Sequence, residues 1–582
     1  MSEQITITHE RTDDIPVILA FLRQMRVAEL IDKHFPTHGH WTGLSLGQML
    51  SVWLTFILSK GDHRLSYVEP WIAAHQQTLS YCLNQQVLPR DGTDDRLARG
   101  LDDLGVVDHW VECECELNQT LIRVYDLQPK TARVDPTTVS AYVTPDGMFQ
   151  LGHSKDYRPD LPQLKIALST LDPLGLPMTI AAVAGNTADD PLYLPEIAKV
   201  RRSVGQTGMT YIGDCKIAAL ATRVDIVAHD DFYLCPLSAK QVSAAELERR
   251  LEPVWSGQQP LEEVRLTDES DADDDDDEPD AVGFAYTSEQ GGQDQSGQPQ
   301  RWQERRLVVR SLAHARLQEE SLRKRAKRAT DEINALNERK QGKKRLADEA
   351  EARQAAEAIV APHHVAEVVR IAVRTTVHEA TKRRYGQRPA QTIRTTHVRV
   401  EAGIDHVALE QAVRRLGWRV YATNHDQETM SLKQVVAAYR SEYLVEQGIR
   451  RLKGRALSLT PLYLRDEQRI VGLIFLLSIA LRVLVLMQFV ARENLKKEGT
   501  TLKGIYPGQP GRQTTLPTTE MMLCAFRGIT LSRVTINGAT YEHLTSLNPV
   551  QERIVALMKI PRETFSKLVP QLSKTDSHSH EP

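Results

Sequence analysis

The segment Ile470–Val490 (IVGLIFLLSIALRVLVLMQFV) restricts the fold of this chain more than any other, because it is almost wholly apolar. A run of this length is close to what a helix needs to span a bilayer. Arg482 and Gln488 lie inside it, however, and an arginine at mid-membrane is costly. We therefore predict a buried helix in a large domain and no membrane partner.

The length of the chain requires more than one domain. Hydrophobic cores stop growing at about 250–300 residues, and this chain has 582, so we expect two to four domains. Its hydrophobic and charged fractions, 41% and 25%, are typical of a soluble globular protein. Residues Met1–Asp14 are polar, unlike a signal peptide. The six cysteines show no disulfide-like spacing, as is usual for a cytoplasmic protein.

The net charge of −4 conceals an uneven distribution. The segment Glu262–Asp280 holds twelve acidic residues and one arginine, a net charge of −11, which leaves +7 on the rest of the chain. Long like-charge blocks are usually solvated, so we expect a disordered loop there, of unassigned role. Basic runs stand elsewhere. These runs are Arg323–Arg328, Arg339–Lys340, Lys343–Arg345 and Lys382–Arg384. Their side chains either contact phosphate groups of a nucleic acid or balance the charge of acidic neighbours.

The first two regions of the chain differ in pattern. Apolar residues recur at helical spacing through residues 1–127, which predicts a helical domain, either for DNA binding or for docking. From 128 to 240 the predicted elements run β, β, β, α, β, α, β. This order favours a mixed α/β sheet with helices packed on its faces.

The remaining regions interrupt and then complete that sheet domain. Residues 241–428 look like an insertion that contains strands, the acidic loop and a long charged helix over Leu317–Ile359. The sheet domain resumes over 429–500 with a helix at Ser431–Gly454, followed by the buried helix. Residues 501–582 form a C-terminal region whose polar tail we expect to be mobile.

Two aspartates stand where a carboxylate is poorly placed for solvation alone. Asp135 lies in the middle of a predicted strand, in Arg-Val-Asp-Pro-Thr-Thr, and Asp214 directly follows the apolar strand Met209–Gly213. On adjacent strands the two carboxylates would repel each other unless a cation lay between them. Magnesium prefers oxygen ligands of this kind. The competing interpretation is that each aspartate serves only as a turn residue or helix N-cap.

The helix Ser431–Gly454 carries a third candidate, Glu446. At helical spacing, Glu446 shares a stripe with Tyr439, Glu442, Arg450 and Lys453. One interpretation is a solvated face on which Glu446 and Arg450 form an i,i+4 ion pair. The other is a metal-binding carboxylate flanked by cations that hold a phosphate backbone. The helix pattern alone does not choose between them.

The same residues carry a resemblance to a known family. The chain resembles bacterial insertion-sequence transposases of the IS-four superfamily, most of all its IS-sixteen-thirty-four branch. Their helix signature is Tyr, two residues, Arg, three residues, Glu, six residues, Lys. This chain matches it at Tyr439, Glu446 and Lys453, with Glu442 in place of the arginine. Further similarity lies in Gly152-His-Ser-Lys-Asp-Tyr-Arg-Pro-Asp-Leu-Pro162, in Gly185-Asn-Thr187 and in Thr423-Asn424.

The resemblance implies a DDE transposase with an RNase H-like catalytic domain. Asp135, Asp214 and Glu446 would be catalytic and would hold two Mg²⁺ ions, with Mn²⁺ as a substitute. The 232 residues between Asp214 and Glu446 leave room for the insertion. Its partners would be double-stranded DNA, as terminal inverted repeats and as target, and a second copy of the chain on that DNA. A prokaryotic, nucleoid-associated location follows.

The family resemblance also implies DNA-binding residues. Tyr439, Arg450 and Lys453 are the candidates for phosphate contacts, and Trp255 and Trp302 for stacking on a flipped base. Ordinary packing of the two tryptophans is the competing interpretation. Two other functions remain open at this point: an RNase H-like metal-dependent nuclease that cuts without joining, and a non-catalytic DNA-binding relative.

Overall fold

The structure is a computed structural model, which describes residues 5–266, 278–338, 346–383, 386, 391–460, 462, 464–536 and 539–569. It divides into two compact units. The first comprises Met1–Cys235, Gly291–Trp302 and Tyr439–Pro582, and the second Pro236–Gln290 and Gln303–Ala438. Most of the acidic run, the basic runs at 339–345, Arg384 and the C-terminal tail from 570 lie outside the described residues.

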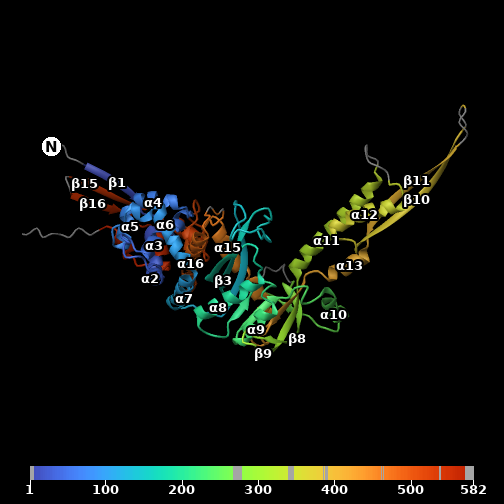
Figure 1. The fold of residues 1–582 in the computed structure, drawn as a ribbon, viewed down its shortest axis with the longest axis horizontal. Helices are drawn as coiled ribbons and strands as arrows, with labels where there is room; N and C mark the ends of the chain where they lie inside the picture. The colour runs from blue at the N-terminus through green and yellow to red at the C-terminus, as the bar shows by residue number, and fades with distance from the viewer. Residues whose placement is uncertain are drawn as a thin grey trace, which may run out of the picture. The chain divides into compact units, whose positions relative to one another are not determined.

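The N-terminal part of the first unit is a group of packed helices (Figure 1). Ser45 and Gln48 form a capping box at the start of α3, and Gly61, in the left-handed region at φ 65°, ends that helix. The helices are α1 (Ile15–Gln24), α2 (Val27–His34), α3 (Leu46–Lys60), α4 (Val68–Ala74), α5 (Gln76–Leu83), α6 (Asp94–Leu104) and α7 (Val107–Val124).

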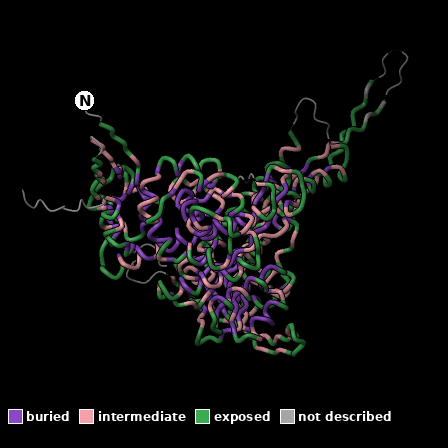
Figure 2. Tube along the Cα trace, turned by 60° about the vertical axis from the view of Figure 1, so that its left-hand side comes forward, coloured by how far each residue is buried: buried purple, intermediate pink, exposed green. Residues whose placement is uncertain are grey.

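The expectation of a wholly helical N-terminal region is wrong at its start. Residues Ile5–Arg11 form strand β1, which pairs antiparallel with β15 (Thr530–Ile536), and β15 pairs with β16 (Ala539–Leu544). The strand is mostly exposed along its length (Figure 2). Its pairing partner is more than 500 residues away, so local periodicity carried no sign of it.

The sheet of the first unit confirms the mixed α/β fold. Its strand order is β4-β3-β2-β5-β6. The pairs β2–β3 and β3–β4 are antiparallel, whereas β2–β5 and β5–β6 are parallel. The elements are β2 (Thr131–Ser140), β3 (Gln163–Leu171), β4 (Leu176–Ala184), α8 (Tyr193–Val204), β5 (Thr210–Ile212), α9 (Leu220–Ala228) and β6 (Phe232–Pro236).

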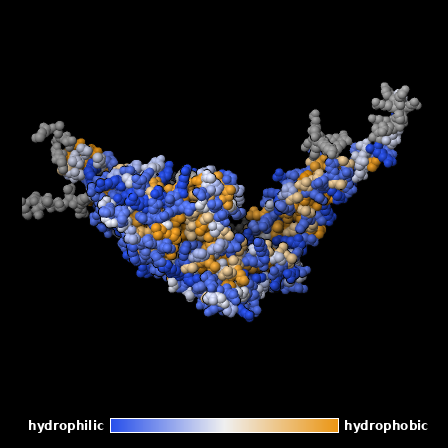
Figure 3. All heavy atoms as spheres, viewed as in Figure 1, coloured by the Kyte–Doolittle hydropathy of each residue, from blue (hydrophilic) through white to orange (hydrophobic). Residues whose placement is uncertain are grey.

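The apolar segment forms most of α16 (Glu467–Glu498), which is buried in the first unit. Among the described residues it is the one helix long and apolar enough to cross a membrane, and 94% of its apolar window is buried inside the protein. It packs against α3, α6, β4, α17 (Thr519–Cys524) and α18 (Pro549–Leu557). The structure thus agrees with the prediction of a buried helix. The face of the molecule drawn in Figure 3 has hydrophobic areas interspersed among hydrophilic ones.

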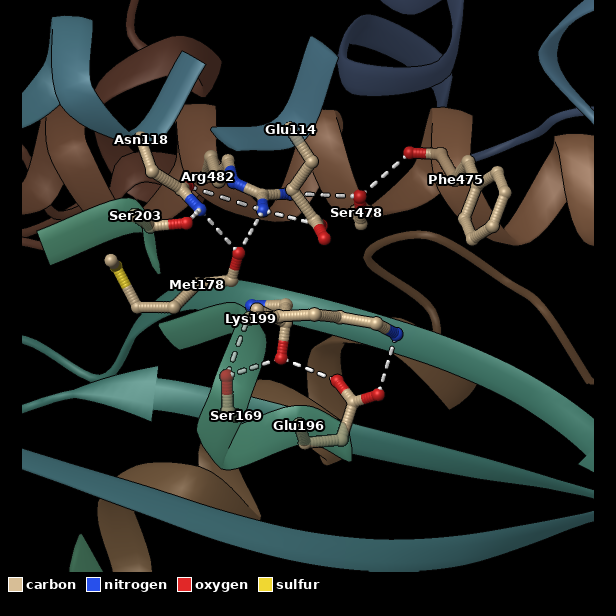
Figure 4. A network of polar contacts seen from close by, with 11 residues as sticks. Glu114, Asn118, Ser169, Met178, Glu196, Lys199, Ser203, Phe475, Ser478 and Arg482 are labelled. Atoms are coloured by element: carbon tan, nitrogen blue, oxygen red, sulfur yellow. Dashed lines mark hydrogen bonds and ion pairs between the residues drawn. The ribbon is translucent and has the colours of Figure 1, made fainter. Parts of the chain in front are cut away.

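Arg482, the charged residue within the apolar segment of α16, lies in a buried polar network (Figure 4), although its Nε has no hydrogen-bond partner among the described residues. The guanidinium of Arg482 donates to Glu114 Oε1 at 2.8 Å, to the Met178 carbonyl at 2.8 Å and to the Ser478 hydroxyl at 2.8 Å. Asn118 donates to the same carbonyl at 2.6 Å. A charge in an apolar helix is tolerated here because protein groups replace water around it.

The predicted helix Ser431–Gly454 is two helices, α14 (Leu432–Arg440) and α15 (Tyr443–Lys453). Between them the backbone tightens: the Glu442 N–H donates to the Tyr439 carbonyl and the Leu444 N–H to the Ser441 carbonyl, both three residues back. Such i→i−3 bonds interrupt an α-helix. Helical periodicity of side chains runs on through this turn, which explains why the sequence predicted one helix.

The second unit contains four sheet strands and a helical arm. Its strand order is β12-β9-β8-β7, formed by β7 (Glu262–Val264), β8 (Ala281–Gln293), β9 (Pro299–Ser311) and β12 (Trp418–Thr423), with α10 (Ala244–Trp255) nearby. The arm, in which the helices lie along a long hairpin (Figure 1), contains α11 (Leu312–Asn334), α12 (Glu349–His363), β10 (Val369–Lys382), β11 (Gln391–Ile404) and α13 (His406–Arg414). The long helix expected over Leu317–Ile359 is therefore two helices.

Candidate active site

Asp135 occupies a partly open position in β2, a strand that is otherwise buried around it. It faces Leu168 of β3 in the register of the sheet. The ammonium of Lys155 lies 3.4 Å from Asp135 Oδ1 and also donates to the Pro136 carbonyl. Sequence reasoning singled out the block that contains Lys155 only for its resemblance to the family, and not as part of the site.

Asp214 follows β5, which runs parallel to β2, with Arg133 paired to Ile212. Asp135 and Asp214 therefore each stand two residues beyond that pair, at the same edge of the sheet. Asp214 Oδ1 accepts hydrogen bonds from the Tyr193 hydroxyl at 2.6 Å and from the Lys216 N–H at 2.8 Å. Burial, reinforced by the Asp214 charge, raises the pKa of Tyr193 well above its usual value, so this hydroxyl stays a donor.

Glu446 stands on α15, a helix that packs on β2, β3 and α16. Val445, Gly448 and Leu452 form its buried face. Glu446 itself is exposed. Burial raises the pKa of Asp135, the Asp214 and Glu446 charges add to the increase, and Lys155 opposes it. The three carboxylates selected from the sequence are thus close enough for their charges to interact.

A fourth carboxylate, Glu442, belongs to the same group. Burial raises its pKa, and the charges of Asp135 and Glu446 raise it further. It lines a small pocket together with Asp135, Asp214 and Tyr439. In the sequence, Glu442 was notable only because it occupies the position of the arginine in the family's helix signature. Its clustering with two aspartates of the sheet appears only when the chain is folded.

The carboxylates fit magnesium in donor type but are not gathered as a ligand set. Within the described part of the chain, no three His, Cys, Asp or Glu side chains converge so that they could hold a metal ion. Magnesium is usually bound through one or two carboxylates, with waters and substrate phosphates completing its octahedron. Two aspartates at one sheet edge match that requirement. A three-carboxylate site would need the Lys155–Asp135 contact to open and Glu446 to turn inward.

The block Gly152–Pro162 is tied to both sides of the site. Lys155 reaches Asp135, and its backbone N–H donates to the Thr138 hydroxyl at 3.0 Å. Asp156, the next residue, accepts from the Lys453 ammonium at 2.7 Å. The lysine of the helix signature is therefore ion-paired to the sequence block that carried the strongest resemblance.

The other predicted DNA-binding residues lie in varied surroundings. Tyr439 lines the carboxylate pocket, and Arg450 is exposed on α15. Trp255 is partly buried against a hydrophobic cluster of the second unit. In the first unit, Trp302 donates its indole N–H to the Tyr233 hydroxyl at 2.9 Å. Both tryptophans thus have packing or hydrogen-bonding roles in the protein itself.

No protein-family model matches the sequence, and no curated protein matches it. Among solved structures, the chain is similar to a piggyBac transposase in a synaptic complex with hairpin DNA, at 8% identity and a TM-score of 0.24. The match covers 49% of this chain and 60% of that one. Likeness this low carries no argument about function.

Proposed function

We propose that this protein is a DNA transposase of the DDE type, with an RNase H-like catalytic domain. The observation that supports this most is the placement of Asp135, Asp214 and Glu446. Two lie at one edge of a mixed sheet, the third on a helix packed over it, and their charges interact. Neighbouring carboxylates whose charges repel one another are typical of a site that binds cations.

The proposed reaction has two displacements at phosphorus. In the first, a water oxygen bonds to phosphorus at the transposon end, the bond to the 3′-oxygen breaks, and that oxygen takes up a proton. In the second, the freed 3′-hydroxyl bonds to a target phosphorus, loses its proton to solvent, and the target strand's own 3′-oxygen leaves. Each bond broken is matched by a bond formed, so joining needs no other reactant.

Asp135, Asp214 and Glu446 are the residues that we propose hold Mg²⁺, or Mn²⁺ in its place. Bound there, two ions would polarise the nucleophile and the leaving oxygen. The chain's own residues do the positioning. Tyr193 fixes the Asp214 carboxylate, and Lys155 lies beside Asp135, where a phosphate would enter. Lys155 can exchange its carboxylate partner for that phosphate without losing a counter-charge.

The remaining assignments belong to the same proposal. The partners are double-stranded DNA, as terminal inverted repeats and target, and a second copy of the chain bound to that DNA. Tyr439, Arg450 and Lys453 contact phosphates, and Trp255 or Trp302 receives a flipped base. For Trp302, stacking would require its hydrogen bond to Tyr233 to break. The location would be the cytoplasm and nucleoid of a prokaryote.

The test is cleavage and strand transfer on DNA that carries the inverted repeats flanking the gene. Wild type is compared with Glu446→Gln, with Mg²⁺ or with EDTA. The matched control is Glu252→Gln, at an exposed glutamate of α10. We expect nicked and joined products that need Mg²⁺ and are lost in Glu446→Gln alone, while binding of the ends survives.

The other outcomes contradict the proposal in distinct ways. Nicking without joining would identify a nuclease. Binding without chemistry would identify a non-catalytic relative. Full activity of Glu446→Gln would refute the assignment of the site.

A further inference from the structure

A groove runs along α15. It is open, holds about 900 Å³, and is lined in the first unit by α15, α16, the β3–β4 turn at Pro173 and Leu174, and the segment Thr515–Glu520. The carboxylate site makes no use of it. Its walls combine four basic side chains and two glutamates, Glu493 and Glu520, with exposed apolar side chains.

The groove adjoins the catalytic carboxylates through the geometry of α15. Successive residues of a helix are about 100° apart, which gives α15 three faces. Val445 and Leu452 point into the core, and Glu446 belongs to the face of the carboxylate site. Tyr443 and Arg450 line the groove, about 40–60° around the helix from Glu446. The groove therefore lies on the face of α15 next to the face that carries Glu446.

The floor of the groove is positively charged and rigid. Arg451 is fixed by Glu520 at 2.9 Å and by Gln488 at 2.7 Å. Arg492 donates to the Pro517 carbonyl at 3.0 Å and to the Leu516 carbonyl at 3.3 Å, which holds the opposite wall. Burial lowers the pKa of Arg492, and the nearby Arg451 charge lowers it further. Arg451 and Arg492 thus place two positive charges in one groove, with Glu520 beside them.

Two more cations stand at the groove with no carboxylate bound to them. Arg450 and Lys496 line it, and the salt bridges among the described residues include neither side chain. Both are exposed. Lys497, the next residue, is also exposed but does not line the groove.

Large apolar side chains line the same groove as the basic ones. Tyr443 is 53% exposed and Leu516 is 63% exposed, and Phe489 lies in the wall between them. Large exposed apolar side chains that gather in one groove mark a binding surface. Grooves that pair aromatic faces with a basic track are the usual way in which proteins hold single-stranded nucleic acid.

We propose that this groove binds a single DNA strand that continues from the scissile phosphate, with a base stacked on Tyr443 and phosphates on Arg450 and Lys496. The inference rests on the proposed function, because it takes the strand to start at Glu446. A single strand is favoured because base faces are accessible to Tyr443 and Leu516 only outside a duplex. The strand comes either from the transposon end or from its flank, and both have this chemistry.

The test measures binding of duplexes that carry the terminal repeat and a short single-stranded extension, 3′ or 5′, with 2-aminopurine in the extension. The variants are Tyr443→Ala and Lys496→Ala. Their matched controls are Tyr541→Ala, at a tyrosine that is 50% exposed on β16, and Lys497→Ala. Comparison of the 3′ extension with the 5′ extension identifies which strand enters the groove.

We expect wild type to quench the 2-aminopurine signal in one arm and to prefer that duplex over a blunt one. Tyr443→Ala should lose the quench and bind the extended duplex about 5- to 100-fold more weakly. Lys496→Ala should weaken it several-fold and reduce the slope of log K against log salt by about 0.7. Binding of the blunt duplex, and both control variants, should match wild type.

Failure of this inference is distinguishable from failure of the proposed function. Normal strand transfer together with an unchanged quench in Tyr443→Ala would refute the binding of a single strand in the groove, but not the proposed transposase function. Equal effects of Lys496→Ala and Lys497→Ala would also overturn it, since they would indicate a diffuse charge effect. Quenching that depends on Tyr443, in a protein with no strand-transfer activity, would support the groove and refute the transposase.

Discussion

Arg482 of α16 and Glu114 of α7 form a buried ion pair, with 2.8 Å between Nη2 and Oε1. The Arg482 side chain is 0% exposed and that of Glu114 is 3% exposed. Burial raises the pKa of Glu114, and the Arg482 charge opposes that increase. This pair joins the N-terminal helices to the apolar helix, and it explains how an arginine persists in the middle of an apolar segment.

Arg482→Ala should destabilise the first unit by about 3–5 kcal/mol, because it leaves Glu114 buried without a counter-charge. Chemical denaturation followed by circular dichroism measures this. Arg202→Ala is the control, since Arg202 pairs with Glu112 at the surface, where a pair contributes about 1 kcal/mol or less. The double variant Glu114→Gln/Arg482→Met should recover part of the loss. Equal effects of Arg482→Ala and Arg202→Ala would contradict a structural role for the buried pair.

Glu442→Gln should stabilise the protein in EDTA. Burial raises the pKa of Glu442, and the charges of Asp135 and Glu446, which repel its ionised form, raise it further. Removing that charge should increase the free energy of unfolding by a few tenths to about 1 kcal/mol. A carboxyl whose pKa is raised by folding destabilises the folded protein as the pH rises through that pKa. The increase in the free energy of unfolding caused by Glu442→Gln should therefore be larger at pH 8 than at pH 4. A destabilised Glu442→Gln at pH 8 would argue that this carboxylate makes a favourable contact.

Tyr193→Phe should reduce DNA cleavage about 10- to 100-fold while the fold stays intact. The variant removes the hydrogen bond to Asp214, and groups that orient a metal-binding carboxylate have effects of this size. Tyr125→Phe is the matched control, because the buried Tyr125 hydroxyl has no hydrogen-bond partner among the described residues. A rise in the Mg²⁺ concentration needed for half-maximal cleavage separates a role in positioning Asp214 from a loss of folded protein.

The second unit should lose stability as pH falls from about 6.5 to about 4. Burial lowers the pKa of His425 from 6.5 to about 4, with Arg305 contributing and Asp426 opposing. As the pH falls through this range, His425 of the unfolded chain therefore takes up a proton before His425 of the folded protein does. The free energy of unfolding found above pH 6.5 declines by roughly 1–3 kcal/mol as a result. Comparison of unfolding of wild type and His425→Gln at pH 7.5 and 4.5 measures it. Parallel pH profiles for the two proteins would refute the assignment.

Local pattern predicted much of the catalytic half of the first unit. The order β, β, β, α, β, α, β is the one found over 131–236, because alternation within strands and helical spacing are set by neighbouring residues. Asp135 and Asp214 could be chosen for the same reason, since each interrupts or ends a strand. The break within the predicted helix 431–454 was missed, because side-chain periodicity continues across a short tight turn. The predicted helix 317–359 ends early, since α11 stops at Asn334 and α12 begins only at Glu349.

What the sequence determined by itself is which residues stand at strand centres and strand ends, and that one long segment had to be buried. Only the tertiary structure decided which of them meet. β1 pairs with a strand more than 500 residues away, Lys155 and Glu442 join the aspartates, and Lys453 pairs with Asp156. The physical reason is that these contacts depend on strand order and helix packing across the whole unit. Periodicity reports only the face of an element and not its partner.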